Sequence, residues 1–274
     1  MNAPHLSRYQ RLIAHLAGQA LDLAEPHVDP AEPGSLAIGL PAARAMLAAS
    51  DEQAVAMGET ASDAWRALAD SRGELRDALG HTRPTYYALV LAMTWATWAP
   101  ANHKSVDVET MERAEQTLDA RDEIELRLLS TRATGDAGQV TDAMIAGADD
   151  GAMHPYVDGQ ELIDVWWYRE LVAIHALGAL ALSSQPDRRL LTRLQRAVMY
   201  HLENTQPDHT TAQPWGVAAF AFFPEAIPFA DQQLHDAQAN WTTAGPASAL
   251  LPGLILADAA HTLARVTQLD PTPA

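Results

Sequence analysis

The chain has 274 residues and no cysteine, and its 18 basic and 35 acidic side chains give it a formal net charge of −17. Without cysteine it can form no disulfide, thiolate nucleophile or cysteine-ligated zinc site. Nucleic acids and anionic membranes attract basic proteins, so the charge argues against both as partners. Apolar residues make up 48% of the chain, and no secretory signal is visible in residues 1–12. We expect a globular, cytoplasmic protein, whose oligomeric state the sequence leaves open.

Apolar residues recur at three- and four-residue spacing along most of the chain, and no segment alternates with period two. This pattern predicts an all-α fold of helical hairpins stacked in one domain, 1–274, with a framework half (1–133) and a half that carries the site (159–268). The uncharged stretch 84–103 is interpreted as a buried helix rather than a membrane span. In chain order, helices are predicted at 6–24, 41–49, 52–79, 84–98, 108–131, 140–148, 160–182, 188–203, 226–239 and 247–268.

A polar loop, 201–215, follows the helix at 188–203 and concentrates chemically active side chains. It holds two histidines, two carboxylates, two glutamines, two prolines and a tryptophan. Polar side chains are costly to order unless they serve a purpose, so the loop is the first candidate site. The apolar face of the preceding helix places its last histidine inward. The candidate catalytic residues are His201, Asp208 and His209, and the candidate substrate-binding residues are Gln206, Gln213 and Trp215.

The helix at 160–182 supplies a second set of candidates. Asp164, Tyr168 and His175 fall on one helical stripe, where the carboxylate could orient the imidazole and the phenol could donate to a substrate oxygen. The alternative is a solvated face with one satisfied core histidine. Trp166 and Trp167 cover another part of the helix surface and are candidate binding residues.

Metal and cofactor sites find little support in the residue pattern. The best metal-ligand set would be His175, His201, Asp208 and His209, but neither His-Glu-x-x-His nor a facial-triad spacing is present. No phosphate loop or dinucleotide-binding glycine motif occurs either, so we expect no cofactor and no bound metal. Further along, the side chains at positions 258, 261 and 265 are interpreted as a solvated face.

The segment from Arg196 to Gln206, followed by Trp215-Gly216, resembles the Gln/Trp repeat of terpenoid-cyclase and prenyltransferase toroids. That repeat runs from a basic residue through a small, an aromatic and an aliphatic residue to Gln, and ends in Gly-x-Trp. Here glycine follows tryptophan, and the gap after glutamine is longer. The acidic and cysteine-containing catalytic motifs of those families are absent, and neither 119–123 nor 149–153 fits the magnesium-binding motif of terpene synthases. The resemblance therefore implies an (α/α) toroid architecture without a catalytic set.

These observations favour a protein with an aromatic-lined pocket between hairpins. We expect it to bind or convert a small molecule, apolar and terpenoid-like or a carbohydrate, by acid–base chemistry of the lyase, isomerase or hydrolase type. The alternative is a non-catalytic helical-repeat scaffold for protein–protein interaction, which would expose an apolar or charged stripe instead.

Overall fold

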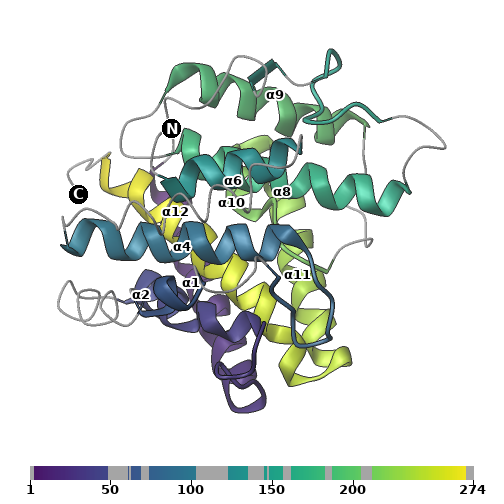
Figure 1. Cartoon of the computed structure of the whole chain (residues 1–274). Helices are drawn as coiled ribbons and strands as arrows, with labels where there is room; N and C mark the ends of the chain where they lie inside the picture. The colour runs from purple at the N-terminus through teal and green to yellow at the C-terminus, as the bar shows by residue number, and fades with distance from the viewer. Residues whose placement is uncertain are drawn as a thin grey trace.

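The computed structural model describes residues 3–48, 61, 63–68, 74–102, 123–134, 145–146, 148–156, 162–182, 187–204 and 212–269 (Figure 1). Within these ranges the regular structure is helical, and only isolated bridges join residues 35, 76 and 82. The predicted all-α class is confirmed. The toroidal arrangement that the resemblance implies stays a prediction.

Within the described residues, short connections or 3₁₀ turns join several of the helices. The longer helices are α1 (Ala3–Ala24), α2 (Leu40–Leu47), α4 (Pro84–Asn102), α6 (Ile124–Thr134), α8 (Ile163–Ala181), α9 (Arg188–Asn204), α10 (Val217–Phe222), α11 (Ile227–Ala244) and α12 (Leu250–Leu269). The 3₁₀ turns are η1 (Glu25–His27), η2 (Leu36–Gly39), η4 (Pro224–Ala226) and η5 (Pro246–Ala249).

Three boundaries differ from the predicted helices for local reasons. The helix predicted at 52–79 does not extend to residue 79, because the chain forms a turn there. The Asp77 carboxylate accepts the backbone N–H groups of Leu79 and His81 in this turn. The predicted helix at 108–131 is not continuous, since Glu123 is not helical and α6 begins at the next residue. The structure also adds α10, a short apolar helix too brief to give a periodic signal.

Figure 1 shows the helices in tiers, with α9 along the top, α6, α8 and α10 below it, α4 across the middle, and α1, α2 and α11 in the lower half, while α12 runs obliquely from the left side past α4 into the lower half. The most extensive helix–helix contact joins the two ends of the chain, α1 and α12. A Cβ atom at Gly253 would lie 2.8 Å from Leu21 Cδ2, so this close approach requires glycine. One continuous apolar core extends from α1 to α12 and draws on both halves of the chain.

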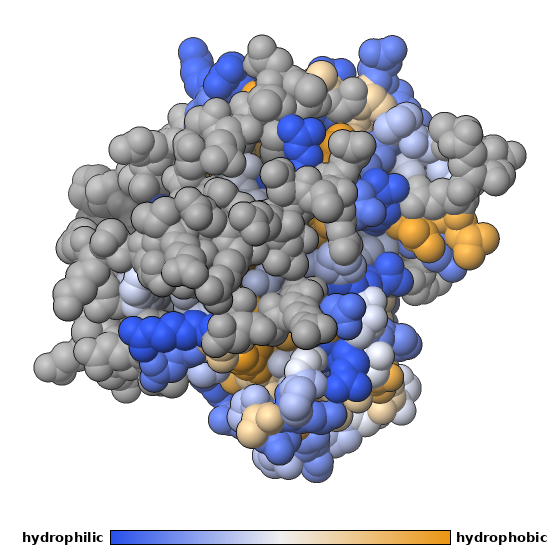
Figure 2. All heavy atoms as spheres, viewed as in Figure 1, coloured by the Kyte–Doolittle hydropathy of each residue, from blue (hydrophilic) through white to orange (hydrophobic). Residues whose placement is uncertain are grey.

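Within the described residues, one segment, Pro246–Thr267, is long and apolar enough to cross a membrane by length and composition. Most of it is buried inside the protein, and core helices of globular proteins pass the same test. On the outside, Figure 2 shows mostly hydrophilic side chains among the coloured atoms, with small apolar patches. Among the described large apolar side chains, Leu162 has the highest exposed fraction, 75%, and it lies beside Ile163, 46% exposed, at the start of α8.

Candidate functional site

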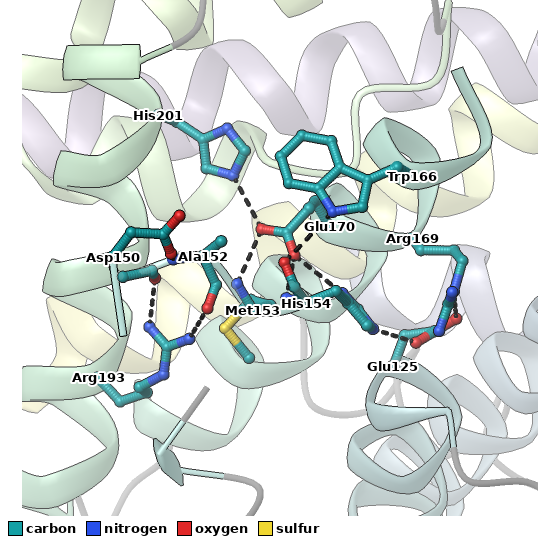
Figure 3. Close-up of polar contacts among 11 residues, drawn as sticks. Glu125, Asp150, Ala152, Met153, His154, Trp166, Arg169, Glu170, Arg193 and His201 are labelled. Atoms are coloured by element: carbon teal, nitrogen blue, oxygen red, sulfur yellow. Dashed lines mark hydrogen bonds and ion pairs between the residues drawn. The ribbon is translucent and has the colours of Figure 1, made fainter. Parts of the chain in front are cut away.

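A tight turn at 148–154 positions the centre of the candidate site. Gly151 has a φ of +109°, a conformation that favours glycine, and its Cα faces the backbone of α9, where a Cβ would lie 3.2 Å from Arg196 O. The turn ends with the backbone N–H groups of Met153 and His154, which both donate to the carboxylate of Glu170 on α8 (Figure 3). Two amide donors thus hold this buried carboxylate in one orientation.

His154 lies between two carboxylates. Its Nδ1 is 2.9 Å from Glu170 Oε1, and its Nε2 is 2.7 Å from Glu125 Oε2 on α6. Burial disfavours the charged imidazolium, but the hydrogen bonds and charges of Glu125 and Glu170 outweigh it and raise the pKa of His154 to about 9. At neutral pH this histidine is therefore a buried cation with an anion on each side.

The two ends of this arrangement differ in exposure. At one end, Glu125 Oε1 accepts a 2.8 Å hydrogen bond from Arg169 Nε, and the Arg169 side chain is 28% exposed. At the other end, Glu170 Oε2 is 3.3 Å from Nε2 of the fully buried His201 on α9. Burial would raise the pKa of Glu170, but His154 and His201 lower it to about 2. His154 and Arg169 similarly hold the pKa of Glu125 below its ordinary value, against burial.

Acidic and basic side chains therefore alternate along one hydrogen-bonded path. We call this set the Glu170 network; from the partly exposed end inward its members are Arg169, Glu125, His154, Glu170 and His201. Three helices and the 148–154 turn supply them. Within this path the imidazoles and carboxylates can pass a proton along their hydrogen bonds, whereas the guanidinium of Arg169 only donates and keeps its charge.

Aromatic side chains enclose the inner end of the network. The rings of Trp167 and Tyr200 lie 5.0 and 5.5 Å from the His201 ring, measured between centroids. Trp166 donates its Nε1–H to His154 O at 3.3 Å and meets the ring of Tyr156 edge-on at 5.5 Å. Tyr156 is 41% exposed, so this aromatic wall reaches the surface there.

A second buried ionic group, the Asp258 cluster (Arg132, His175 and Asp258), joins α6, α8 and α12. Two guanidinium nitrogens of Arg132 each lie 2.5 Å from an oxygen of Asp258, and His175 Nε2 lies 2.6 Å from Oδ2 of the same carboxylate. The other ring nitrogen, Nδ1, is 3.0 Å from the backbone oxygen of Trp215. Burial opposes the charge of Asp258, but Arg132 and His175 hold its pKa far below the ordinary range.

The structure separates the residues that the sequence pattern placed on one stripe of α8. Asp164 is exposed at the start of the helix. The Tyr168 hydroxyl pairs with Thr85 Oγ1 at 3.0 Å, and His175 belongs to the Asp258 cluster. These three side chains therefore do not form one acid–base set, because the stripe winds past different neighbouring helices.

The loop candidates divide in a similar way. His201 is fully buried, as the helical pattern predicts, and it enters the Glu170 network. Trp215 is buried against His175, in the other cluster, with ring centroids 5.3 Å apart, and Gln213 is partly buried nearby in sequence. The remaining loop candidates lie outside the described residues; they are Gln206, Asp208 and His209.

One interpretation is wrong: positions 258, 261 and 265 do not form a solvated face. Asp258 is fully buried, and His261 is partly buried with its pKa lowered to about 4 by burial and by the charge of Arg132. The apolar residues of α12 surround these positions on all sides, since nearly the whole helix is buried. A polar i,i+3 pair on such a helix is enclosed rather than solvated.

Sequence reasoning also missed Glu125, His154 and Glu170. The available signal was Glu170, which follows Trp166 by four residues and so shares its buried face in the middle of an apolar helix. A carboxylate at such a position needs a buried partner. Nothing in the sequence pointed to His154, which lies in a Gly- and Asp-rich connection.

The network has the composition of a metal site but not its geometry. Its residues follow one another along a path, so no three carboxylates or imidazoles converge on one point. Within the described part of the chain, no group of three or more His, Asp or Glu side chains is arranged to hold a metal ion. Comparison with protein-family models, with curated proteins and with solved structures gave no match for this chain.

Proposed function

We propose that this protein binds a small molecule against its aromatic wall and acts on it by general acid–base chemistry at His201. The ligand class that fits the wall is an apolar, terpenoid-like compound or a carbohydrate, because both pack against indole and phenol rings. The observation that carries the proposal is the alternation of acid and base from Arg169 to His201. Burying four ionisable side chains is costly, and perturbed groups of this kind are concentrated at functional sites.

The roles of the side chains follow from their positions. His201 is the acid–base group, since it pairs with Glu170 and lies among the aromatic rings. Glu170 orients the imidazole of His201 through Nε2, and two backbone amides fix Glu170 in turn. His154 and Glu125 connect this pair to the partly exposed end of the network, where Arg169 keeps a fixed positive charge beside Glu125. A ligand would approach from the side of Tyr156, where the wall is exposed.

The test is a binding and turnover assay with farnesol and cellobiose as probes, followed by tryptophan fluorescence and by mass spectrometry of the products. At least one probe should bind the wild-type chain and change the emission of the indoles. His201→Gln should weaken binding about tenfold and abolish turnover, because the amide cannot exchange a proton. Glu203→Gln is the matched control, since Glu203 is exposed two residues later on α9 and should leave both unchanged.

The proposal fails if neither probe binds, or if His201→Gln binds and converts them as the wild type does. In that event the Glu170 network is structural, and the interaction scaffold becomes the better account. The exposed pair Leu162 and Ile163 favours this second function, because adjacent exposed apolar side chains are typical of contact surfaces.

A further inference from the structure

A strongly basic cavity lies on α9, on the outer side of the helix that carries His201. Its volume is about 490 Å³, which is within the range of small-molecule sites. Its lining residues are Ile145, Arg188, Arg189, Thr192, Arg193 and Arg196. Four of the 18 basic residues of an acidic chain are thus gathered within nine positions.

The arginines share one face of the helix. Arg193 and Arg196 follow Arg189 by four and seven residues, and Arg196 follows Arg188 by eight. Like charges this close repel one another unless anions balance them. Arg189 has such an anion, Asp187, at 2.9 Å. Arg188 and Arg196 are exposed and form no ion pair within the part of the chain that the structure describes. The described lining of the cavity therefore holds four arginines and no carboxylate.

Arg193 provides a buried donor at this cavity. Its side chain is only 1% exposed, and its two terminal nitrogens donate to the backbone oxygens of Gly151 and Ala152 at 2.7 and 2.5 Å (Figure 3). Both acceptors are neutral. Burial lowers the pKa of Arg193, and the nearby charges of Glu170 and Asp150 offset this only in part, without an ion-pair contact among the described residues. The remaining donor, Nε, is buried without a hydrogen-bond partner. A buried guanidinium with an unpaired N–H donor is unusual unless a ligand accepts a hydrogen bond from it.

We propose that this cavity binds the phosphate group of a small molecule. Guanidinium groups match the oxygens of phosphate with pairs of parallel hydrogen bonds, and several of them around one cavity suit a dianion better than a carboxylate. The chain is too acidic for the phosphate to belong to a nucleic acid, because its net charge of −17 opposes a polyanion. Arg193 also holds the 148–154 turn that positions Glu170, so the cavity lies beside the Glu170 network. Arg188 and Arg196 are not members of that network, so a loss of phosphate binding in their variants is distinguishable from a failure of the function proposed above.

The experiment is isothermal titration of the full chain with inorganic phosphate, glycerol 3-phosphate and glycerol. Both phosphates should bind and glycerol should not. The double variant Arg188→Gln/Arg196→Gln changes two exposed side chains, and it should bind phosphate about tenfold more weakly. The matched control, Arg8→Gln/Arg11→Gln, removes the same charge from exposed positions on α1 and should bind like the wild type.

Tighter binding of glycerol 3-phosphate assigns the cavity to a phosphorylated molecule, and tighter binding of inorganic phosphate assigns it to the free ion; either result supports a phosphate site. The proposal is overturned if neither phosphate binds at concentrations up to about 10 mM. It is equally overturned if the control pair on α1 loses as much affinity as the pair on α9, because the effect would then reflect net charge alone.

Discussion

The Glu170 network and the Asp258 cluster both stabilise charged side chains inside the apolar core, but they do so in different ways. In each, α8 brings an ionisable side chain into the apolar core, where a charge is stable only beside an opposite charge. The Asp258 cluster is closed: one carboxylate receives Arg132 and His175, and the second nitrogen of His175 is occupied by a backbone oxygen. The Glu170 network is open, since its path continues to the partly exposed Arg169.

Under the proposed function, this difference would separate a structural role for the Asp258 cluster from a functional role for the Glu170 network. A closed cluster has no route for protons or ligands, and its three side chains join α6, α8 and α12 at fixed distances. An open path that ends among aromatic rings can change protonation without dismantling the core. Substitutions should therefore affect stability most in the Asp258 cluster and least at the exposed end of the Glu170 network.

The largest effect should come from Asp258→Asn. The amide keeps the shape of the side chain but removes the negative charge, which leaves the buried Arg132 without a counter-ion. We expect the free energy of unfolding to fall by about 3–5 kcal/mol, measured by urea denaturation. Asp63→Asn is the control; Asp63 is exposed and pairs with Arg66 at the surface, so its loss should be about 0.5 kcal/mol or less. Equal losses would show that the Asp258 cluster does not hold the helices together.

The pH dependence of stability should reveal the Glu170 network. The pKa of His154 is about 9 in the folded chain and about 6.5 unfolded, so its contribution is complete below pH 6.5 and is lost as the pH rises through 9. The pKa of Glu170 falls to about 2, so its contribution is complete above pH 4.5 and is lost as the pH falls through 2. For His261, whose folded pKa is about 4, stability increases with pH between 4 and 6.5.

Together these groups predict maximal stability near pH 6.5, with a decline on both sides, measured by urea denaturation across the range. His154→Gln should flatten the alkaline side, because only His154 among these groups has its pKa raised through that range. An alkaline decline of the same size in this variant would contradict the assignment, and would place the responsible charge elsewhere in the chain.

The sequence predicted the architecture better than the site. Helical class follows from local periodicity, and the inward orientation of His201 follows from the leucines that share its face. Partnership within a buried cluster depends instead on residues far apart in the chain: Glu125 and His154 are 29 positions apart, and His175 and Asp258 are 83 apart. No spacing rule encodes such contacts.

The stripe on α8 shows why the missing information matters. Tyr168 and His175 share a helical face, but Tyr168 contacts Thr85 on α4, whereas His175 contacts Asp258 on α12. Glu170, on the face interpreted as apolar, becomes the centre of the network because the 148–154 turn offers it two amide donors. The sequence of a helix shows which face carries a polar side chain, but only the packing of the helices shows which residues that side chain contacts.

The smallest effect should come from Arg169→Gln, at the open end of the network. Its ion pair with Glu125 is partly exposed and screened by solvent, so the free energy of unfolding should fall by about 1 kcal/mol or less. Arg132→Gln, the same change at the closed cluster, should cost about 3–5 kcal/mol because it leaves Asp258 buried and charged. Urea denaturation at low and high salt measures both, and added salt should reduce only the Arg169 effect, because buried pairs are screened much less. Equal costs for the two arginines would mean that the Glu170 network is as closed as the Asp258 cluster, and would remove the exposed route on which acid–base chemistry at His201 depends.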